Sequence, residues 1–511
     1  MRSVIFTVSF ILLSIVVVNA QKQSELNWFS QYQETYRAEI MQQYIDFISI
    51  PNTTSSQGML LKNAQFLLKQ MQLAGIKQVQ LLKLNENIPP VVYGEVKVPG
   101  ATQTIVFYAH YDGQPADSTN WYKGLHPFIP SFYNYPIQEG GTSLTKEQFI
   151  DSLNDDYRIY CRGVADDKAG VMAIIQAYIA LKKINIQPKF NIKFFFEGEE
   201  EAGSPHLGEV LQQNKLLLQS DIWIICDGPQ PFNKKNLISF GVRGDTHMDI
   251  TLYGSKVPLH SGHYGNWAPN PAWNLIRLLA SMKNDSGYVT IKNFYADVQP
   301  FSAEDKKLLA DLDLNDAKLK QEFGFNHAEM QNVSLSEAIF LPTLNINGIA
   351  SGNVGKLSTN SIPASASVSL DLRLVPGNDY QKQQQKVLQH IQSKGYYIID
   401  HEPSDHERMA HTHIAKVICG SGYNAQKTPI NLPISQKIIQ AISTISTNGL
   451  MIMPLTGGSL PLFTIEQQLN AKAISIPIAN YDDNQHAANE NIRIGNFWNG
   501  IKEMISIMTM Q

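Results

Sequence analysis

Short apolar runs alternate with helical stretches between Ser24 and Phe240. The runs "TIVFYAH", "NIKFFFEG" and "DIWIICDG" are rich in β-branched and aromatic residues, which predicts buried strands. Between them, "DDKAGVMAIIQAYIALKK" places apolar residues at helical spacing, so we expect a helix there. This alternation is typical of an α/β domain with a mainly parallel sheet flanked by helices.

The pattern changes after residue 241. The segments "THMDITLYGS" and "ASASVSLDLRLVP" alternate with period two, whereas "NPAWNLIRLLASM" and "DYQKQQQKVLQHIQSKG" have helical spacing. We expect a smaller α+β domain with one exposed sheet face at 242–402. Because "AKAISIPIAN" again indicates a buried strand, this domain interrupts a larger one formed by 21–241 and 403–511.

The N-terminus predicts export. Met1-Arg2 is followed by a mostly apolar run and then by "VNA", which is typical of a signal peptide over 1–20, cleaved after Ala20. The run is short for a membrane span, although an uncleaved anchor helix is the alternative. After cleavage we expect no stable membrane insertion and a periplasmic or secreted protein.

Composition narrows the function classes. The 511 residues are 43% hydrophobic and carry a net charge of -4, with no basic block, so we expect two or three domains and no nucleic-acid binding. Three cysteines do not form a disulfide framework, and we expect three buried thiols.

Acidic and histidine residues follow the predicted strands directly. Ligands of open α/β sheets bind at the carboxyl ends of strands, so these side chains are expected to converge. Alone, each is as typical of a turn or a solvated helix start, and it is the joint order that indicates a site. The set is His110, Asp112, Glu200, Glu201 and Asp227, with Asp166 on a helix-opening loop and His486 after the last strand.

Two imidazoles with several carboxylates suit Zn²⁺ or Mn²⁺. Two cations that share a carboxylate and a hydroxide would explain how so many acids coexist. His110 and Asp112 are two residues apart on an extended segment and face the same way. Asp112 can therefore accept the ring N–H of His110 and orient the imidazole.

The motifs resemble those of the M20 metallopeptidases, which include carnosinase-like dipeptidases, carboxypeptidases, aminoacylases and deacylases. In chain order they are "HYDGQP", "CRGVADDKAG", "EGEEEAGS", "CDG", "PLHSGHYG", "NSIPASASVSLDLRLVP", "TGGSLP" and "QHAANE". The resemblance implies a zinc-exopeptidase-like catalytic domain at 21–241 and 403–511. It also implies that 242–402 is a lid and dimerisation domain, through which a homodimer could form.

The resemblance also implies a pair of divalent metal ions, with Zn²⁺ expected and Mn²⁺ or Co²⁺ as alternatives. It implies a cis peptide between Asp166 and Asp167. Carried over motif by motif, one metal would bind His110 and Asp227, the other would bind Glu201 and His486, and Asp166 would bridge both.

For catalysis, the resemblance implies that Glu200 is the general base. His260 would stabilise the oxyanion, in dimeric relatives that of the partner subunit, and His263 is its rival in the same loop. Substrate contacts would come from Arg373 and Asn360, and from Gly458 and Ser459 of "TGGSLP".

The expected reaction is hydrolysis of the amide bond of dipeptides or short peptides with a free C-terminal carboxylate, by a metal-bridging hydroxide. Leu455 stands where dipeptidase relatives usually carry an Arg, which leaves room for an N-acyl-amino-acid deacylase or amidase. A catalytically silent binding protein is the alternative from another class, but every ligand position and Glu200 are present. The insertion at 130–157 has no readable role.

Overall fold

The computed structural model describes residues 28–511 except 153, 313 and 461. The predicted signal peptide at 1–20 lies outside the described residues. The chain forms two compact units, which are described separately. Unit 1 contains the described residues up to Phe240 together with Thr428–Ile452 and Ile465–Gln511, and unit 2 contains Gly241–Lys427 and Met453–Thr464.

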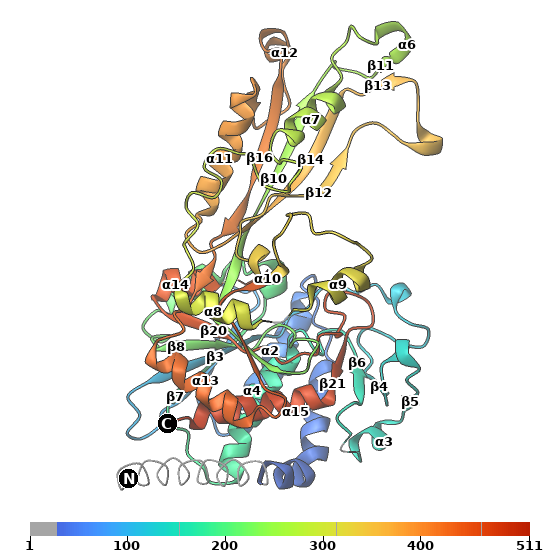
Figure 1. Cartoon of the computed structure of the whole chain (residues 1–511). Helices are drawn as coiled ribbons and strands as arrows, with labels where there is room; N and C mark the ends of the chain where they lie inside the picture. The colour runs from blue at the N-terminus through green and yellow to red at the C-terminus, as the bar shows by residue number, and fades with distance from the viewer. Residues whose placement is uncertain (1–27, 153, 313, 461) are drawn as a thin grey trace. The chain divides into compact units, whose positions relative to one another are not determined.

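Unit 1 is built on a large sheet (Figure 1). Its four central strands are parallel, while the pairs β1–β2, β2–β7 and β20–β9 are antiparallel. The expected parallel α/β core is therefore confirmed at the centre of the sheet. The strand order is β1 (Lys77–Leu82), β2 (Val91–Val96), β7 (Asn191–Glu197), β3 (Thr104–His110), β8 (Ile222–Ile225), β20 (Lys472–Ser475), β9 (Asn236–Ser239) and β18 (Leu450–Met453).

The predicted helix after "CRGVA" is α4 (Lys168–Lys183), and most of its residues are buried. It contacts β3 and also α15 (Ile494–Thr509), which in turn contacts α13 (Pro433–Ile445). A helix that is enclosed in this way carries apolar residues around most of its circumference. Earlier in the chain, helix α2 (Gln57–Leu73) packs against strands β1 and β2. The short α5 (Leu207–Gln213) follows the acidic run.

The 130–157 insertion forms part of a small second sheet in unit 1. Its strands are β21 (Asn491–Arg493), β6 (Arg158–Tyr160), β4 (Ser131–Tyr133) and β5 (Ser143–Leu144), with α3 (Lys146–Ile150) after β5. Strand β6 pairs with β21, so Tyr160 lies opposite Asn491. The β6–β21 pairing joins the segment before "CRGVADD" to the segment after "QHAANE", and the insertion extends this sheet through β4, which pairs with β6.

Unit 2 contains a sheet with one covered and one polar face. Helices α7 (Pro271–Ala280) and α11 (Tyr380–Ser393) contact its strands, and Met248, Ile250 and Leu370 belong to the apolar core. The expected exposed sheet face is confirmed, since most alternate residues of β10 and β14 are polar and partly or fully exposed, with Arg243 and Asp371 buried among them. The strand order is β12 (Asn345–Ala350), β14 (Ser365–Leu374), β10 (Gly241–Tyr253), β16 (Ile414–Tyr423) and β15 (Tyr397–Ile399).

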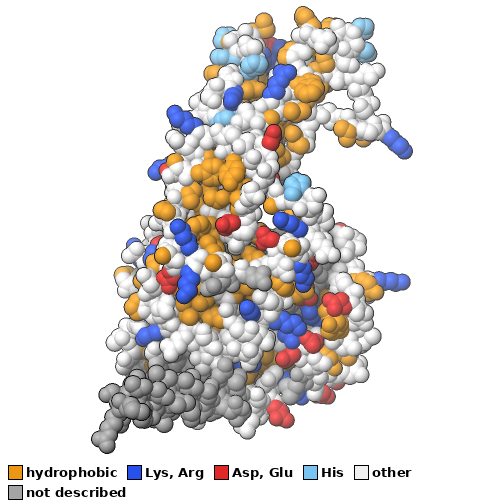
Figure 2. Space-filling view, viewed as in Figure 1, with side chains coloured by type: hydrophobic (Ala, Val, Ile, Leu, Met, Phe, Trp, Pro, Cys, Tyr) orange, Lys and Arg blue, Asp and Glu red, His pale blue; other side chains and the backbone are white. Residues whose placement is uncertain are grey.

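Unit 2 continues past residue 402 because β16 pairs with β10 along most of its length. Strand β19 (Thr456–Ser459) also pairs with β10, which brings the "TGGS" motif into unit 2. Helices α8 (Ala303–Asp311), α9 (Asp316–Phe323) and α10 (Leu335–Ala338) are among those that were not predicted from the sequence. Figure 2 shows histidine side chains exposed around α6 (Ser261–Tyr264) and α12 (Asp405–Ala410).

The expectation of three buried thiols is wrong for Cys419. Cys161 and Cys226 are buried, whereas Cys419 is exposed on β16. It lies beyond Val417, the last β16 residue in the apolar core of unit 2. Among the described residues, no helix combines the length and the apolarity needed to cross a bilayer.

Candidate metal centre

The candidate ligands of unit 1 lie at the ends of adjacent parallel strands. His110 is the last residue of β3, Asp227 follows β8, and Glu200 begins a 3₁₀ turn, η3 (Glu200–Ala202), after β7. Because β7, β3 and β8 are parallel neighbours, their carboxyl ends meet at one edge. Asp166 reaches this edge from the loop before α4, through the expected cis peptide Asp166–Asp167.

Asp166 lies between the two histidines. Its Oδ1 is 3.0 Å from Nε2 of His110, and its Oδ2 is 3.0 Å from Nε2 of His486. Nε2 of His110 is also 3.7 Å from Oδ2 of Asp227, and Nε2 of His486 is 3.0 Å from Oε2 of Glu201. Two sets of ligand atoms therefore converge, His110–Asp166–Asp227 and Asp166–Glu201–His486, and each could hold a metal ion.

The electrostatics of the cluster fit a pair of dications. Burial, and then the charge of neighbouring acids such as Asp227, raises the pKa of Glu200 well above its ordinary value. Burial likewise raises the pKa of Asp227 to about 7. Oδ2 of Asp166 is buried and makes no hydrogen bond of good geometry. Crowded carboxylates with an unsatisfied oxygen are stabilised when cations bind among them.

Asp112 links the first histidine to the acidic turn. Its Oδ1 is 3.4 Å from Nδ1 of His110, close to the predicted orienting position, although Nδ1 makes no hydrogen bond of good geometry. The same carboxylate accepts the backbone N–H groups of Glu200 at 3.2 Å and Glu201 at 3.0 Å. One buried side chain thus contacts the imidazole and holds the backbone that carries the two glutamates.

The four acids of "EGEEE" have different surroundings. Glu197 is buried, and its Oε2 accepts the hydroxyl of Tyr108 at 2.7 Å. Glu199 pairs with His206 at 2.8 Å. Glu200 and Glu201 are the two acids that lie beside the candidate ligands. Oε2 of Glu200 is 3.8 Å from Nε2 of His110.

Comparison with known proteins identifies the family. The model of peptidase family M20/M25/M40 matches residues 106–509. The chain belongs to this family. It is similar to the Cys-Gly metallodipeptidase DUG1 of Candida albicans, with 25% identity over 478 residues, 89% of this chain and 91% of the relative. It is 27% identical to the Beta-Ala-His dipeptidase of Homo sapiens over 430 residues, 81% of this chain and 76% of the relative.

Among solved structures, this M20 peptidase is similar to the M20 family metallo-carboxypeptidase Sso-CP2 from Sulfolobus solfataricus. The TM-score is 0.75 and the identity 26%, and the match covers 92% of this chain and 98% of that one. The structure of the di-peptidase Dug1p from Saccharomyces cerevisiae matches with a TM-score of 0.72 at 22% identity, over 94% and 98% of the two chains. The fold is thus that of M20 peptidases, and the protein is a peptidase.

Sequence reasoning missed Glu490, which supports the loop that carries Asp166. Glu490 is fully buried, and its oxygens accept the N–H groups of Gly163, Ala165 and Asp166 and a bond from Arg162 Nη1. The sequence feature that could have indicated it is its position: Glu490 is the last residue of "QHAANE" and stands directly before the short strand β21.

The remaining predicted residues of the M20 peptidase lie in unit 2. His260 is exposed in β11 (Leu259–His260) and its ring lies 4.6 Å from that of His263. The carbonyl of Asn360 accepts the N–H of Ser261. Arg373 lies on the polar face of β14, and Gly458 and Ser459 belong to β19. The predicted roles of these residues toward the metal centre stay predictions.

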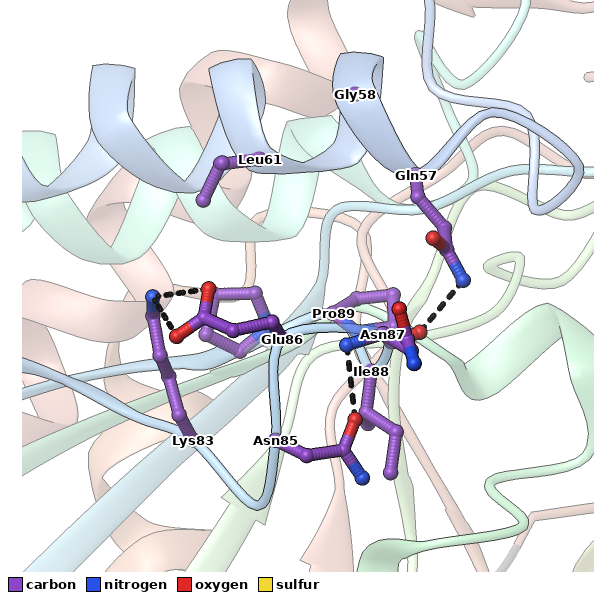
Figure 3. Close-up of a pocket in the computed structure, with 10 residues that line it drawn as sticks. Gln57, Gly58, Leu61, Lys83, Asn85, Glu86, Asn87, Ile88 and Pro89 are labelled. Carbon is purple, nitrogen blue, oxygen red and sulfur yellow. Dashed lines mark hydrogen bonds and ion pairs between the residues drawn. The ribbon is translucent and has the colours of Figure 1, made fainter.

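A pocket of about 220 Å³ lies elsewhere in unit 1, between the start of α2 and the loop after β1 (Figure 3). Gln57 donates to the carbonyl of Asn87 across it, and Lys83 pairs with Glu86 at its rim. None of the candidate ligands lines this pocket, so we assign it no part in the peptidase centre.

Proposed function

We propose that this M20 peptidase hydrolyses dipeptides or short peptides with a free C-terminal carboxylate, using two divalent cations held in unit 1. The observation that carries the proposal is the position of Asp166, whose two oxygens each face a different histidine. A carboxylate placed in this way is suited to bridge two cations. Zn²⁺ fits the ligand set, with Mn²⁺ or Co²⁺ as alternatives.

His110 and Asp227 would hold one cation, and Glu201 and His486 the other. The metal pair would supply Lewis acidity, lowering the pKa of a water molecule and polarising the scissile carbonyl. His486 is about half exposed, whereas His110 is buried. The side chain of His486 therefore lies on the side of the centre that solvent and substrate can reach.

Glu200 would act as the general base. Its carboxylate lies next to the ligands, while its backbone N–H is held by Asp112. A carboxyl group whose pKa lies above its ordinary value can take a proton from water and later give it to the leaving amine. Glu201 faces His486 instead, which supports a ligand role for it.

Two relatives support a dipeptidase over other M20 activities. One is named as a Cys-Gly metallodipeptidase and the other as a Beta-Ala-His dipeptidase, and both cover most of this chain. We propose Arg373 as the contact for the substrate's carboxylate, since a guanidinium forms charge-assisted bonds to it. His260 would stabilise the oxyanion, and a homodimer through unit 2 and export of the chain remain part of the proposal.

The test is a substrate panel with metal analysis of the same preparation. It contains Cys-Gly, β-Ala-His, a tripeptide and N-acetyl amino acids. We expect release of free amino acids from at least one dipeptide. Hydrolysis of the N-acetyl amino acids alone would make the protein a deacylase. A preparation with two metals per chain that hydrolyses nothing would contradict the proposal and favour a binding protein.

A further inference from the structure

A second group of ligand-type side chains lies on the polar face of the unit 2 sheet. Strands β10 and β14 are antiparallel, with Asp245 opposite Arg373 and His247 opposite Asp371. Residues two apart on a strand point to the same face. The four side chains therefore form two facing pairs on one surface, at positions fixed by the strand register.

Three of these side chains bring ligand atoms close together. Nε2 of His247 is 3.1 Å from Oδ2 of Asp245, and its Nδ1 is 3.6 Å from Oδ1 of Asp371. One ligand atom from each residue lies within 4.8 Å of the other two. All three come from ordered strands, so the geometry does not depend on a loop.

A second observation points to a missing ligand. Asp371 is only 7% exposed, and its Oδ1, which faces His247, has no hydrogen-bond partner in the described part of the chain. Oδ1 of Asp245 is likewise buried without such a partner. A buried acceptor without a partner costs free energy, which a bound cation would recover.

The guanidinium group of Arg373 lies beside both acids and, of these two oxygens, leaves only Oδ1 of Asp371 without a contact to it. Nε of Arg373 donates to the other oxygen of Asp371, Oδ2, at 3.3 Å, and lies 3.6 Å from Oδ1 of Asp245. Arg243 donates to the carbonyl of Leu341. Two carboxylates this close favour a cation between them.

We propose that Asp245, His247 and Asp371 bind one divalent transition-metal cation of the Zn²⁺ class. An imidazole with two carboxylates is a ligand set for Zn²⁺ or Mn²⁺ rather than for Ca²⁺, which takes oxygen ligands only. The side chain of His247 is 53% exposed, so the cation can enter from solvent and keep a water ligand. Its three ligands differ from those of the unit 1 centre, and the inference does not depend on the proposed function.

The experiment measures Zn²⁺ bound per full-length chain, after chelation, dialysis against Zn²⁺ and removal of the excess. We expect His247→Ala and Asp245→Asn each to bind one equivalent less than the wild type, with unchanged circular dichroism. His401→Ala is the matched control, because His401 is also flanked by two carboxylates, Asp400 and Glu407, on an exposed surface. It should bind as much as the wild type.

Equal Zn²⁺ content in the wild type and in both test variants would overturn the proposal. So would a loss of the same size in His401→Ala, because that result would indicate non-specific binding to exposed histidines. Since only the difference between wild type and variant is read, the result stands whether or not unit 1 binds two metals.

Discussion

Oε1 of Glu490 accepts a hydrogen bond from the backbone N–H of Asp166 at 3.1 Å. The same buried carboxylate pairs with Arg162 at 2.8 Å and accepts two further N–H groups of the loop. The segment after the last strand thus holds the loop that carries the proposed bridging ligand, although Glu490 itself is not among the candidate ligands.

Removal of this carboxylate should damage both stability and metal content. In Glu490→Ala, Arg162 and three backbone N–H groups lose their buried partner, and we expect a loss of about 3–5 kcal/mol in unfolding free energy. Metal content should fall because the loop of Asp166 is no longer fixed. Glu490→Gln keeps one acceptor oxygen and should lose less. Denaturant unfolding with metal analysis checks this, and a fully stable Glu490→Ala would refute the supporting role.

Replacement of Glu200 should separate chemistry from metal binding. We expect Glu200→Gln to lower kcat by about 10²–10⁴-fold, because a general base contributes that much, while both metals stay bound. Kinetics and metal analysis of one preparation test this. Near wild-type turnover in Glu200→Gln would show that another group is the base.

Replacement of His486 should remove one metal and leave the other. His486 faces only the Asp166–Glu201 set, so His486→Ala should bind one equivalent less in the unit 1 centre. His206→Ala is the control, since His206 pairs with Glu199 outside both ligand sets. Metal analysis that shows equal losses in the two variants would argue against the assignment.

Replacement of Arg373 should weaken substrate binding. A charge-assisted bond to a substrate carboxylate is worth about 1.5–3 kcal/mol, so Arg373→Met should raise KM by about 10–150-fold. The effect should vanish for substrates whose C-terminal carboxylate is amidated. If the variant discriminates between free and amidated substrates as the wild type does, Arg373 is not the anchor.

A buried acid in α15 should make stability depend on pH. Burial raises the pKa of Glu503 to about 8, from an ordinary value of 4.5. Between these values the folded state holds a proton that the unfolded state lacks, so stability falls as pH rises, by up to about 1.4 kcal/mol per pH unit. Glu503→Gln removes this contribution. The Tm of Glu503→Gln should fall less than that of the wild type between pH 5 and 8. If the plots of Tm against pH run parallel for the two proteins, Glu503 does not have a raised pKa in the folded state.

The pattern of the sequence predicted what depends on local periodicity. Strand β3 and helix α4 lie where the apolar spacing placed them, and the ligands that follow strands were found because parallel strands end at one edge. What the sequence could not show depends on contacts between distant segments. Glu490 looked like one more polar residue of a loop, and its burial follows from the pairing of β21 with β6.

The same limit explains the unit 2 cluster. Asp245 and His247 alternate with the buried residues Thr246 and Met248, which is typical of a solvated sheet face. Only the register between β10 and β14 places Asp371 opposite His247, and that register is not readable from either strand alone. The three helices between 303 and 338 were missed because their apolar periodicity is weak and their lengths are short.

The position of β20 between β8 and β9 constrains the order of events during biosynthesis. A growing polypeptide completes β9 long before Ser475 leaves the ribosome, and at ordinary rates of translation the gap lasts roughly ten to fifty seconds. Until then two sheet edges stay open in the nascent chain, and His486 has not yet been made. Loading of the second metal is therefore an event that follows translation of nearly the whole chain, and a chaperone that shields open strand edges would act in that interval.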